Sequence, residues 1–254
     1  MSFTSLDIEN IKYFVRNAKV RISVHHDSAK FYFDDVNDFA SRLVFINIDR
    51  HSDFHLNISN EALTPANWCN FVLLENELDS FYWVYPLDIV FDKSSNYPLD
   101  IGPLTLKNKS FIPQKPYIKR VYLDRINSEI LSSKKIQTLK NNCMEFEIEY
   151  FYKNNNLKEV LLNISNLNTL PIFKSQQIFC SIDADYFSSN SFSPIYSFIN
   201  EKFLYQRISS FLKIVKKKKL QPNYLSLTYS PNYILPSHYR IISDFFNLLK
   251  KYSI

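Results

Sequence analysis

The stretch RLVFINIDRHSDFH, residues 42–55, joins a continuous apolar run to ionisable side chains at every second position. A continuous apolar run of this length is typical of a strand that is buried on both faces of a parallel sheet. The run ends abruptly at Asp49, and His51, Asp53 and His55 follow in the same rhythm. These four groups indicate either a solvated strand end or a metal site.

The same organisation recurs along the chain. Further short apolar runs end in polar residues or proline, at 20–24, 81–86, 178–182 and 224–231. Helical patterns fall at 28–41, 65–78, 200–218 and 238–251. This alternation predicts an α/β fold, a three-layer α/β/α sandwich with a mainly parallel central sheet. In such folds ligands bind beyond the carboxyl ends of the strands.

The chain of 254 residues is interpreted as one domain, 1–254, with a less regular excursion around 87–170. No segment has the roughly 18 or more apolar residues that a membrane helix needs. The N-terminus carries Asp7 and Glu9 where a signal peptide would be basic and then apolar. We therefore expect a cytoplasmic protein without a membrane partner.

Composition excludes several classes of chemistry. Gly102 is the only glycine, whereas phosphate-binding loops, dinucleotide fingerprints and the nucleophile elbow all need glycines. The net charge is +5, and the densest basic cluster, 213–219, ends a predicted helix, where lysines complement the helix dipole. We therefore expect no nucleic-acid partner. Three widely spaced cysteines predict neither a disulfide framework nor a zinc knuckle.

Three strand ends supply candidate metal ligands. They carry His26 or its neighbour His25, then Asp49, His51 and Asp53, then Asp183 and Asp185. Carboxylates with imidazoles suit manganese, iron or zinc. Four carboxylates around one pocket would repel one another unless cations neutralised them. Two such cations could also activate water near neutral pH for attack on an electrophilic carbon.

The order of these motifs resembles the ligand pattern of the arginase and deacetylase superfamily. The segments VHHDSAKFYF, INIDRHSDFH, NWCNFVLLENELDSFYWVYP, CSIDADYFS and LSLTYSPNYILP are similar, in this order, to one branch of it. They fall between about residue 20 and residue 245. That branch includes peptide arginases, which convert arginine side chains of ribosomally made precursor peptides to ornithine and release urea.

The resemblance implies two manganese ions. It implies His26, Asp49, Asp53 and Asp183 as ligands of one ion, with His26 preferred to His25. It implies Asp49, His51, Asp183 and Asp185 as ligands of the other ion. Asp49 and Asp183 would bridge the two ions and are therefore the implied catalytic carboxylates. Deacetylases keep only part of this set and use one zinc ion.

Two departures from the arginase pattern concern the substrate. The proton-shuttle histidine of arginases has no counterpart except His55, which is implied to contact the peptide or to act as general acid. Asn57 is a further candidate for substrate binding. The guanidinium-binding glutamate is also missing, because that strand end reads Thr-Tyr-Ser at 228–230. We expect Ser230, or a carboxylate such as Glu75 or Asp79, to take its place.

The sequence therefore predicts a dinuclear, manganese-dependent peptide arginase whose partner is a precursor peptide. One alternative is another metal hydrolase of this fold, an amidohydrolase or deacetylase that uses zinc. The other alternative is a non-catalytic, metal-containing peptide-binding protein.

Overall fold

A computed structural model describes most of the regular elements of the chain. It covers residues 2–36, 43–51, 53, 63, 65, 68–75, 78–86, 117–124, 129–130, 157–174, 176–188 and 200–254. The predicted ligands all fall within these ranges. His55 and Asn57 lie outside them, as does much of the predicted excursion at 87–170.

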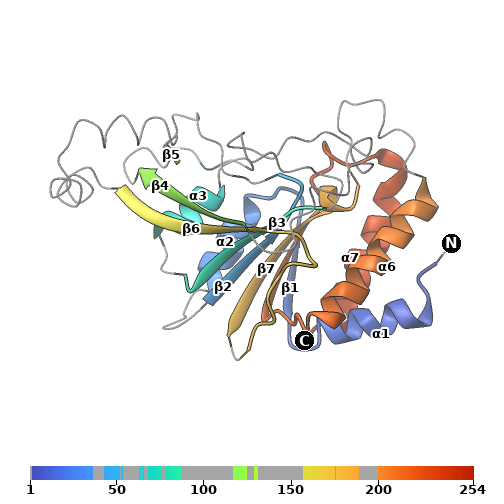
Figure 1. Ribbon diagram of the computed structural model, residues 1–254. Helices are drawn as coiled ribbons and strands as arrows, with labels where there is room; N and C mark the ends of the chain where they lie inside the picture. The colour runs from blue at the N-terminus through green and yellow to red at the C-terminus, as the bar shows by residue number, and fades with distance from the viewer. Residues whose placement is uncertain are drawn as a thin grey trace, which may run out of the picture.

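A sheet with the strand order β1-β8-β7-β2-β3-β6-β4-β5 forms the centre of the molecule (Figure 1). The strands are β1 Lys19–Ser23, β2 Leu43–Ile48, β3 Ser80–Val84, β4 Tyr117–Asp124, β5 Glu129–Ile130, β6 Leu157–Ser165, β7 Gln177–Asp183 and β8 Tyr224–Thr228. In this order every pair of neighbours between β1 and β6 is parallel. At the other edge β4 pairs antiparallel with β6, and β5 pairs antiparallel with β4. The predicted, mainly parallel sheet is confirmed.

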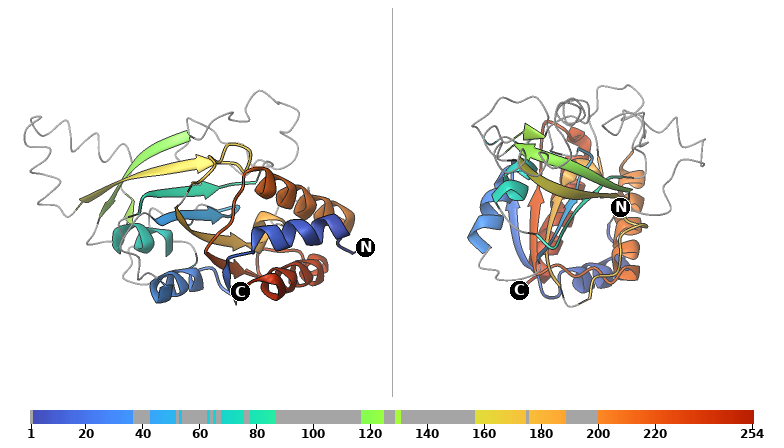
Figure 2. Two further views of the ribbon diagram at one scale, coloured as in Figure 1. Left: turned by 90° about the horizontal axis from the view of Figure 1, so that it is seen from below. Right: turned by 60° about the vertical axis from the view of Figure 1, so that its left-hand side comes forward.

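Helices cover both faces of this sheet. One face carries α2 Ser28–Val36 and α3 Trp68–Glu75, and the other carries α1 Ser5–Phe14, α6 Glu201–Lys217 and α7 Tyr239–Tyr252. In the right-hand view of Figure 2 the sheet separates α2 and α3 from α6. Among the described residues, no helix has both the length and the apolar character needed to cross a bilayer.

The alternation of side chains along β2 shows why its apolar run is continuous. All six residues of β2 are buried. Phe45 packs in the core under α2 and α3, with Phe81 and Phe179 stacked on either side of it. Its neighbour Ile46 packs in the core under α1, α6 and α7. Because each face of the strand meets its own helical layer, neither face can be polar.

Several elements depart from the sequence-based expectation. Helix α1 was not predicted, although Thr4 and Asp7 form a capping box that fixes its start. Strands β4, β5 and β6 lie within the span predicted as a less regular excursion, and β6 extends the parallel sheet beside β3. The sheet is therefore wider than its most apolar runs indicate.

The chain reverses direction across the sheet between β2 and β7. From β2 it continues through α3 to β3, and from β7 it continues through α6 to β8 on the opposite side. The two connections also pass over opposite faces, and in α/β folds ligands bind at such a switch point, beyond the carboxyl ends of the strands. Asp49 follows β2 and Asp183 ends β7, which places both predicted bridging carboxylates at this switch point.

Candidate metal centre

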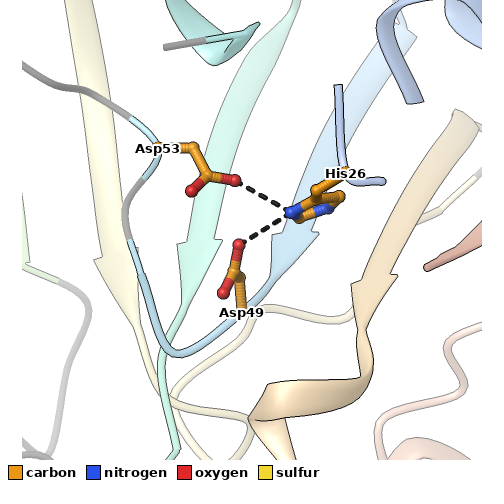
Figure 3. A group of neighbouring side chains, drawn as sticks. All are labelled: His26, Asp49 and Asp53. Atoms are coloured by element: carbon orange, nitrogen blue, oxygen red, sulfur yellow. Dashed lines mark ion pairs between the residues drawn. The ribbon is translucent and has the colours of Figure 1, made fainter. Parts of the chain in front are cut away.

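His26 lies among three carboxylates at the carboxyl edge of the sheet. Its Nδ1 is 3.0 Å from Asp49 Oδ2, 2.9 Å from Asp53 Oδ2 and 3.2 Å from Asp183 Oδ2. Figure 3 shows its ring turned toward Asp49 and Asp53. His26 follows β1, Asp49 and Asp53 follow β2, and Asp183 ends β7, so only the folded sheet brings these residues together. His26, Asp49 and Asp53 form one group that could hold a metal ion.

The choice between the two adjacent histidines is decided by their orientation. His26 is buried and faces the carboxylates, whereas His25 is exposed. The Nε2 of His26 lies 2.8 Å from Ser181 Oγ, on β7. When the Nε2–H donates to Ser181, Nδ1 keeps its lone pair toward the carboxylates, as a metal ligand requires.

A second group consists of Asp49, His51 and Asp185. His51 Nδ1 lies 2.8 Å from Asp185 Oδ2 and 4.0 Å from Asp49 Oδ1. Asp49 therefore belongs to both groups and has one oxygen near each histidine. The side chain of His51 is 52% exposed, whereas that of Asp185 is buried, so this group is open on the His51 side.

The two-residue spacing of both motifs has a local cause. Asp49 Oδ1 accepts a hydrogen bond from the backbone N–H of His51 at 2.8 Å. Asp183 Oδ1 accepts one from the backbone N–H of Asp185 at 3.0 Å. Each aspartate thus caps the turn that ends its strand, as aspartate side chains commonly do. In both cases the other oxygen, Oδ2, remains directed at His26.

Two residues at the site adopt a left-handed backbone without being glycine. Asp53 has a φ of 53° and Ser230 a φ of 41°. Such conformations are unfavourable for residues with a Cβ, and they gather at functional sites. The third described case, Lys219, follows Lys218, the C-cap of helix α6, where a left-handed residue is common.

Neighbouring donors hold the carboxylates in place. The indole Nε1–H of Trp68, the first residue of α3, donates to Asp53 Oδ2 at 2.6 Å. Ser230 Oγ, just beyond β8, donates to Asp183 Oδ2 at 2.5 Å. The Trp83 Nε1–H donates to the backbone carbonyl of Asp49 at 3.1 Å. Contacts of this kind orient metal ligands.

Crowding of like charges dominates the electrostatics of the site. Burial, together with the nearby Asp53 carboxylate, raises the pKa of Asp49. Burial and the neighbouring Asp185 raise the pKa of Asp183 well above its usual range. Burial alone would lower the pKa of His26, but Asp53 and Asp183 hold it well above its usual value. Without a cation the cluster therefore retains protons that a metal ion would displace.

The donor set fits a metal ion better than it fits a hydrogen-bonded ion pair. His26 Nδ1 and Asp49 Oδ2 are 3.0 Å apart and buried, yet neither atom has a hydrogen-bond partner among the described residues. Buried polar atoms are rarely left in this state. Close approach without hydrogen-bond geometry is expected of ligand atoms that face a common cation. Oxygen and imidazole donors suit manganese, iron or zinc.

The structure brings together most of the residues that the sequence singles out. They are His26, Asp49, His51, Asp53, Asp183, Asp185 and Ser230. Asp79 is not among them, because it is exposed, precedes β3 and accepts a hydrogen bond from Gln176. Glu75 ends α3, and its side chain lies outside the description, so its role stays a prediction. His55 and Asn57 also remain predictions.

Several residues that contact the ligands were not identified from the sequence. Ser181 and Trp68 support His26 and Asp53, and the buried Arg50 donates from Nε to the carbonyl of Asp185 at 3.4 Å. Ser181 and Arg50 could have been suspected, because each is a polar residue in or beside a buried strand end. The role of Trp68 depends on helix packing that no local pattern reveals.

No protein-family model matches the chain, and no curated protein matches it significantly. The site is therefore characterised by its own geometry.

Proposed function

We propose that this chain is a manganese-dependent peptide arginase. It would hydrolyse arginine side chains of a ribosomally made precursor peptide to ornithine and urea. The observation that carries the proposal is the sharing of Asp49 between two groups of candidate ligands. A shared carboxylate is what a dinuclear centre requires, whereas a single-metal hydrolase needs one group only.

The arginyl substrate is supported by the sequence motifs and by the openness of the site. The ordered motifs resemble those of peptide arginases, and the side chains of the implied ligand set meet at one edge of the sheet. His51 is half exposed, so a side chain from outside can reach the second group. The reaction adds water to the guanidinium carbon, breaks its bond to Nε, and leaves urea and a protonated ornithine side chain.

The protein's own residues orient the candidate metal ligands and supply a proton for the leaving group. Ser181, Trp68 and Ser230 fix the orientation of His26, Asp53 and Asp183. When bound, two manganese ions would lower the pKa of a water molecule and stabilise charge that develops on the substrate. His55 remains the predicted donor of a proton to the departing nitrogen, which must leave as an amine.

Metal stoichiometry and product mass test the proposal together. The purified protein is stripped with a chelator, reloaded with manganese or zinc, and analysed for bound metal. It is then incubated with arginine-containing peptides and with free arginine. We expect two equivalents of manganese and a loss of about 42 Da per modified arginine, the mass removed by this reaction type. The variant Asp35→Asn, which removes an exposed carboxylate outside both ligand groups, is the control and should behave as the wild type does.

Other outcomes would assign the protein to a different class. One equivalent of zinc with release of an acyl group would identify an amidohydrolase or deacetylase. Bound metal without turnover of any arginine substrate would contradict the proposal and favour a non-catalytic peptide-binding protein.

A further inference from the structure

The strand end that lacks the arginase glutamate presents little to the substrate. Thr228 is buried, and its hydroxyl lies 3.1 Å from that of Ser23 on β1. Tyr229 turns toward α7, where its ring stacks on Tyr239. Ser230 is hydrogen-bonded to Asp183. These three residues are therefore engaged by the protein itself.

The loop that follows carries an aromatic ring back to the metal centre. Ser230 N–H donates to the carbonyl of Val24 at 3.0 Å, and Tyr233 N–H donates to the carbonyl of Ser230 at 2.9 Å. Ile234 is buried and anchors the loop in the core. Between these anchors Tyr233 is 52% exposed, and its ring centroid lies 5.5 Å from that of His51.

We propose that Tyr233 is a substrate-binding residue whose ring face receives the guanidinium group of the substrate arginine. This inference rests on the proposed function. The ring lies beside His51, the exposed member of the second ligand group, so a side chain that approaches this group passes Tyr233. A planar cation gains attraction from an aromatic face.

A ring suits this position for a further reason. A carboxylate next to His51 and Asp185 would add charge to a crowded cluster and would compete for the metal ions. An aromatic face attracts a cation without acting as a metal ligand. Tyr233 therefore offers a means of recognising arginine at a strand end that reads Thr-Tyr-Ser.

The test measures peptide binding to variants of Tyr233. The probe is a short fluorescein-labelled peptide with one central arginine, and its Kd is measured by anisotropy on the metal-free protein. We expect Tyr233→Leu to raise the Kd about fivefold and Tyr233→Phe to change it less than about twofold, since the ring face is kept. With manganese bound, the KM should rise by the same factor while kcat changes little.

Two controls separate substrate contact from support of His51. Tyr239→Leu removes another exposed tyrosine, which stacks on Tyr229 and contacts no candidate ligand in the described residues, and should leave the Kd unchanged. Manganese titrations of Tyr233→Leu should match those of the wild type. A weakened metal affinity, an unchanged peptide Kd, or no measurable peptide binding by the wild type would each overturn the role of Tyr233.

Failure of this inference is distinguishable from failure of the proposed function. The proposed function is decided by mass spectrometry of wild-type reactions. The role of Tyr233 is decided by Kd differences that need no turnover.

Discussion

Asp49 is the residue on which both groups of candidate ligands depend. Its Oδ2 faces His26, and its Oδ1 lies near His51 while it accepts the His51 backbone N–H. Asp185, by contrast, belongs to the second group only. Both carboxylates are buried, so replacing either with an amide removes one buried charge, from a shared ligand at Asp49 and from an unshared ligand at Asp185.

Asp49→Asn should abolish binding at both metal positions, whereas Asp185→Asn should weaken one. An amide has one neutral oxygen and cannot bridge two cations as a carboxylate does. We expect wild-type protein to bind two equivalents of manganese, Asp185→Asn to retain about one, and Asp49→Asn to retain none. Metal analysis after dialysis measures this. Equal stoichiometry in the two variants would contradict the shared role of Asp49.

Trp68→Phe should lower metal affinity about 10- to 100-fold without removing a ligand. The indole N–H holds Asp53 Oδ2, the oxygen that faces His26, and phenylalanine has no donor. Trp83→Phe is the matched control, because its donor holds the Asp49 carbonyl, which belongs to neither ligand group. Competition with a calibrated chelator gives the affinities. If both variants lost affinity equally, loss of packing would explain the effect.

The candidate metal ligands could be predicted from the sequence more completely than the residues that hydrogen-bond to them. Asp49, His51 and Asp53 follow one buried run, so their convergence follows from sheet geometry. The decision between His25 and His26 needed a resemblance, because both follow the same strand. Trp68 lies 15 residues from Asp53 in sequence, and only the packing of α3 on the sheet brings its indole to the carboxylate.

At the scale of elements, most of the predicted strands are largely buried, whereas β1, at the sheet edge, was predicted although only Val20 of it is buried. β2 and β7 read as continuous apolar runs because a helical layer covers each side. β4 and β6 form an antiparallel pair toward the sheet edge, and their sequences mix charged with apolar residues. Such strands lack the apolar continuity that identifies β2. The short helix α1 is fixed by its cap rather than by an obvious apolar stripe.

Thr4→Ala should therefore destabilise the protein through α1. Thr4 Oγ1 accepts the Asp7 backbone N–H at 3.2 Å, and Asp7 Oδ2 accepts the Thr4 backbone N–H at 3.0 Å. Loss of this box should cost about 1 kcal/mol. Urea unfolding should show a lower midpoint with an unchanged m-value. Thr4→Ser keeps the hydroxyl and should behave as wild type; a loss equal to that of alanine would contradict the cap.

At the scale of the whole molecule, the site concentrates repulsion that the rest of the fold must offset. Four buried carboxylates meet at the switch point between β2 and β7. The apolar cores on both faces of the sheet hold the strand ends together despite this repulsion. A metal ion that binds only the folded chain relieves the repulsion and stabilises the protein, by about 2.7 kcal/mol at a free concentration of 100 times Kd.

The stabilisation of the folded protein by bound metal should grow as the pH rises from about 6.5 to about 10. Burial would lower the pKa of His51, but Asp185 raises it from the ordinary 6.5 to about 10, and the carboxylates also raise that of His26. A raised histidine pKa stabilises the metal-free fold below about 6.5, and that contribution is lost as the pH rises toward the folded-state value. Deprotonation at the same time frees the imidazoles to bind metal.

The metal-free protein should therefore lose stability across this range while the manganese-loaded protein loses less. Thermal unfolding in excess chelator and in excess manganese, compared at pH 6.5 and at pH 8, gives the difference in Tm at each pH. We expect the larger difference at pH 8. Asp49→Asn, which cannot hold the ions, should show no manganese-dependent difference at either pH. A difference that shrank with rising pH would mean that the raised histidine pKa values do not oppose metal binding.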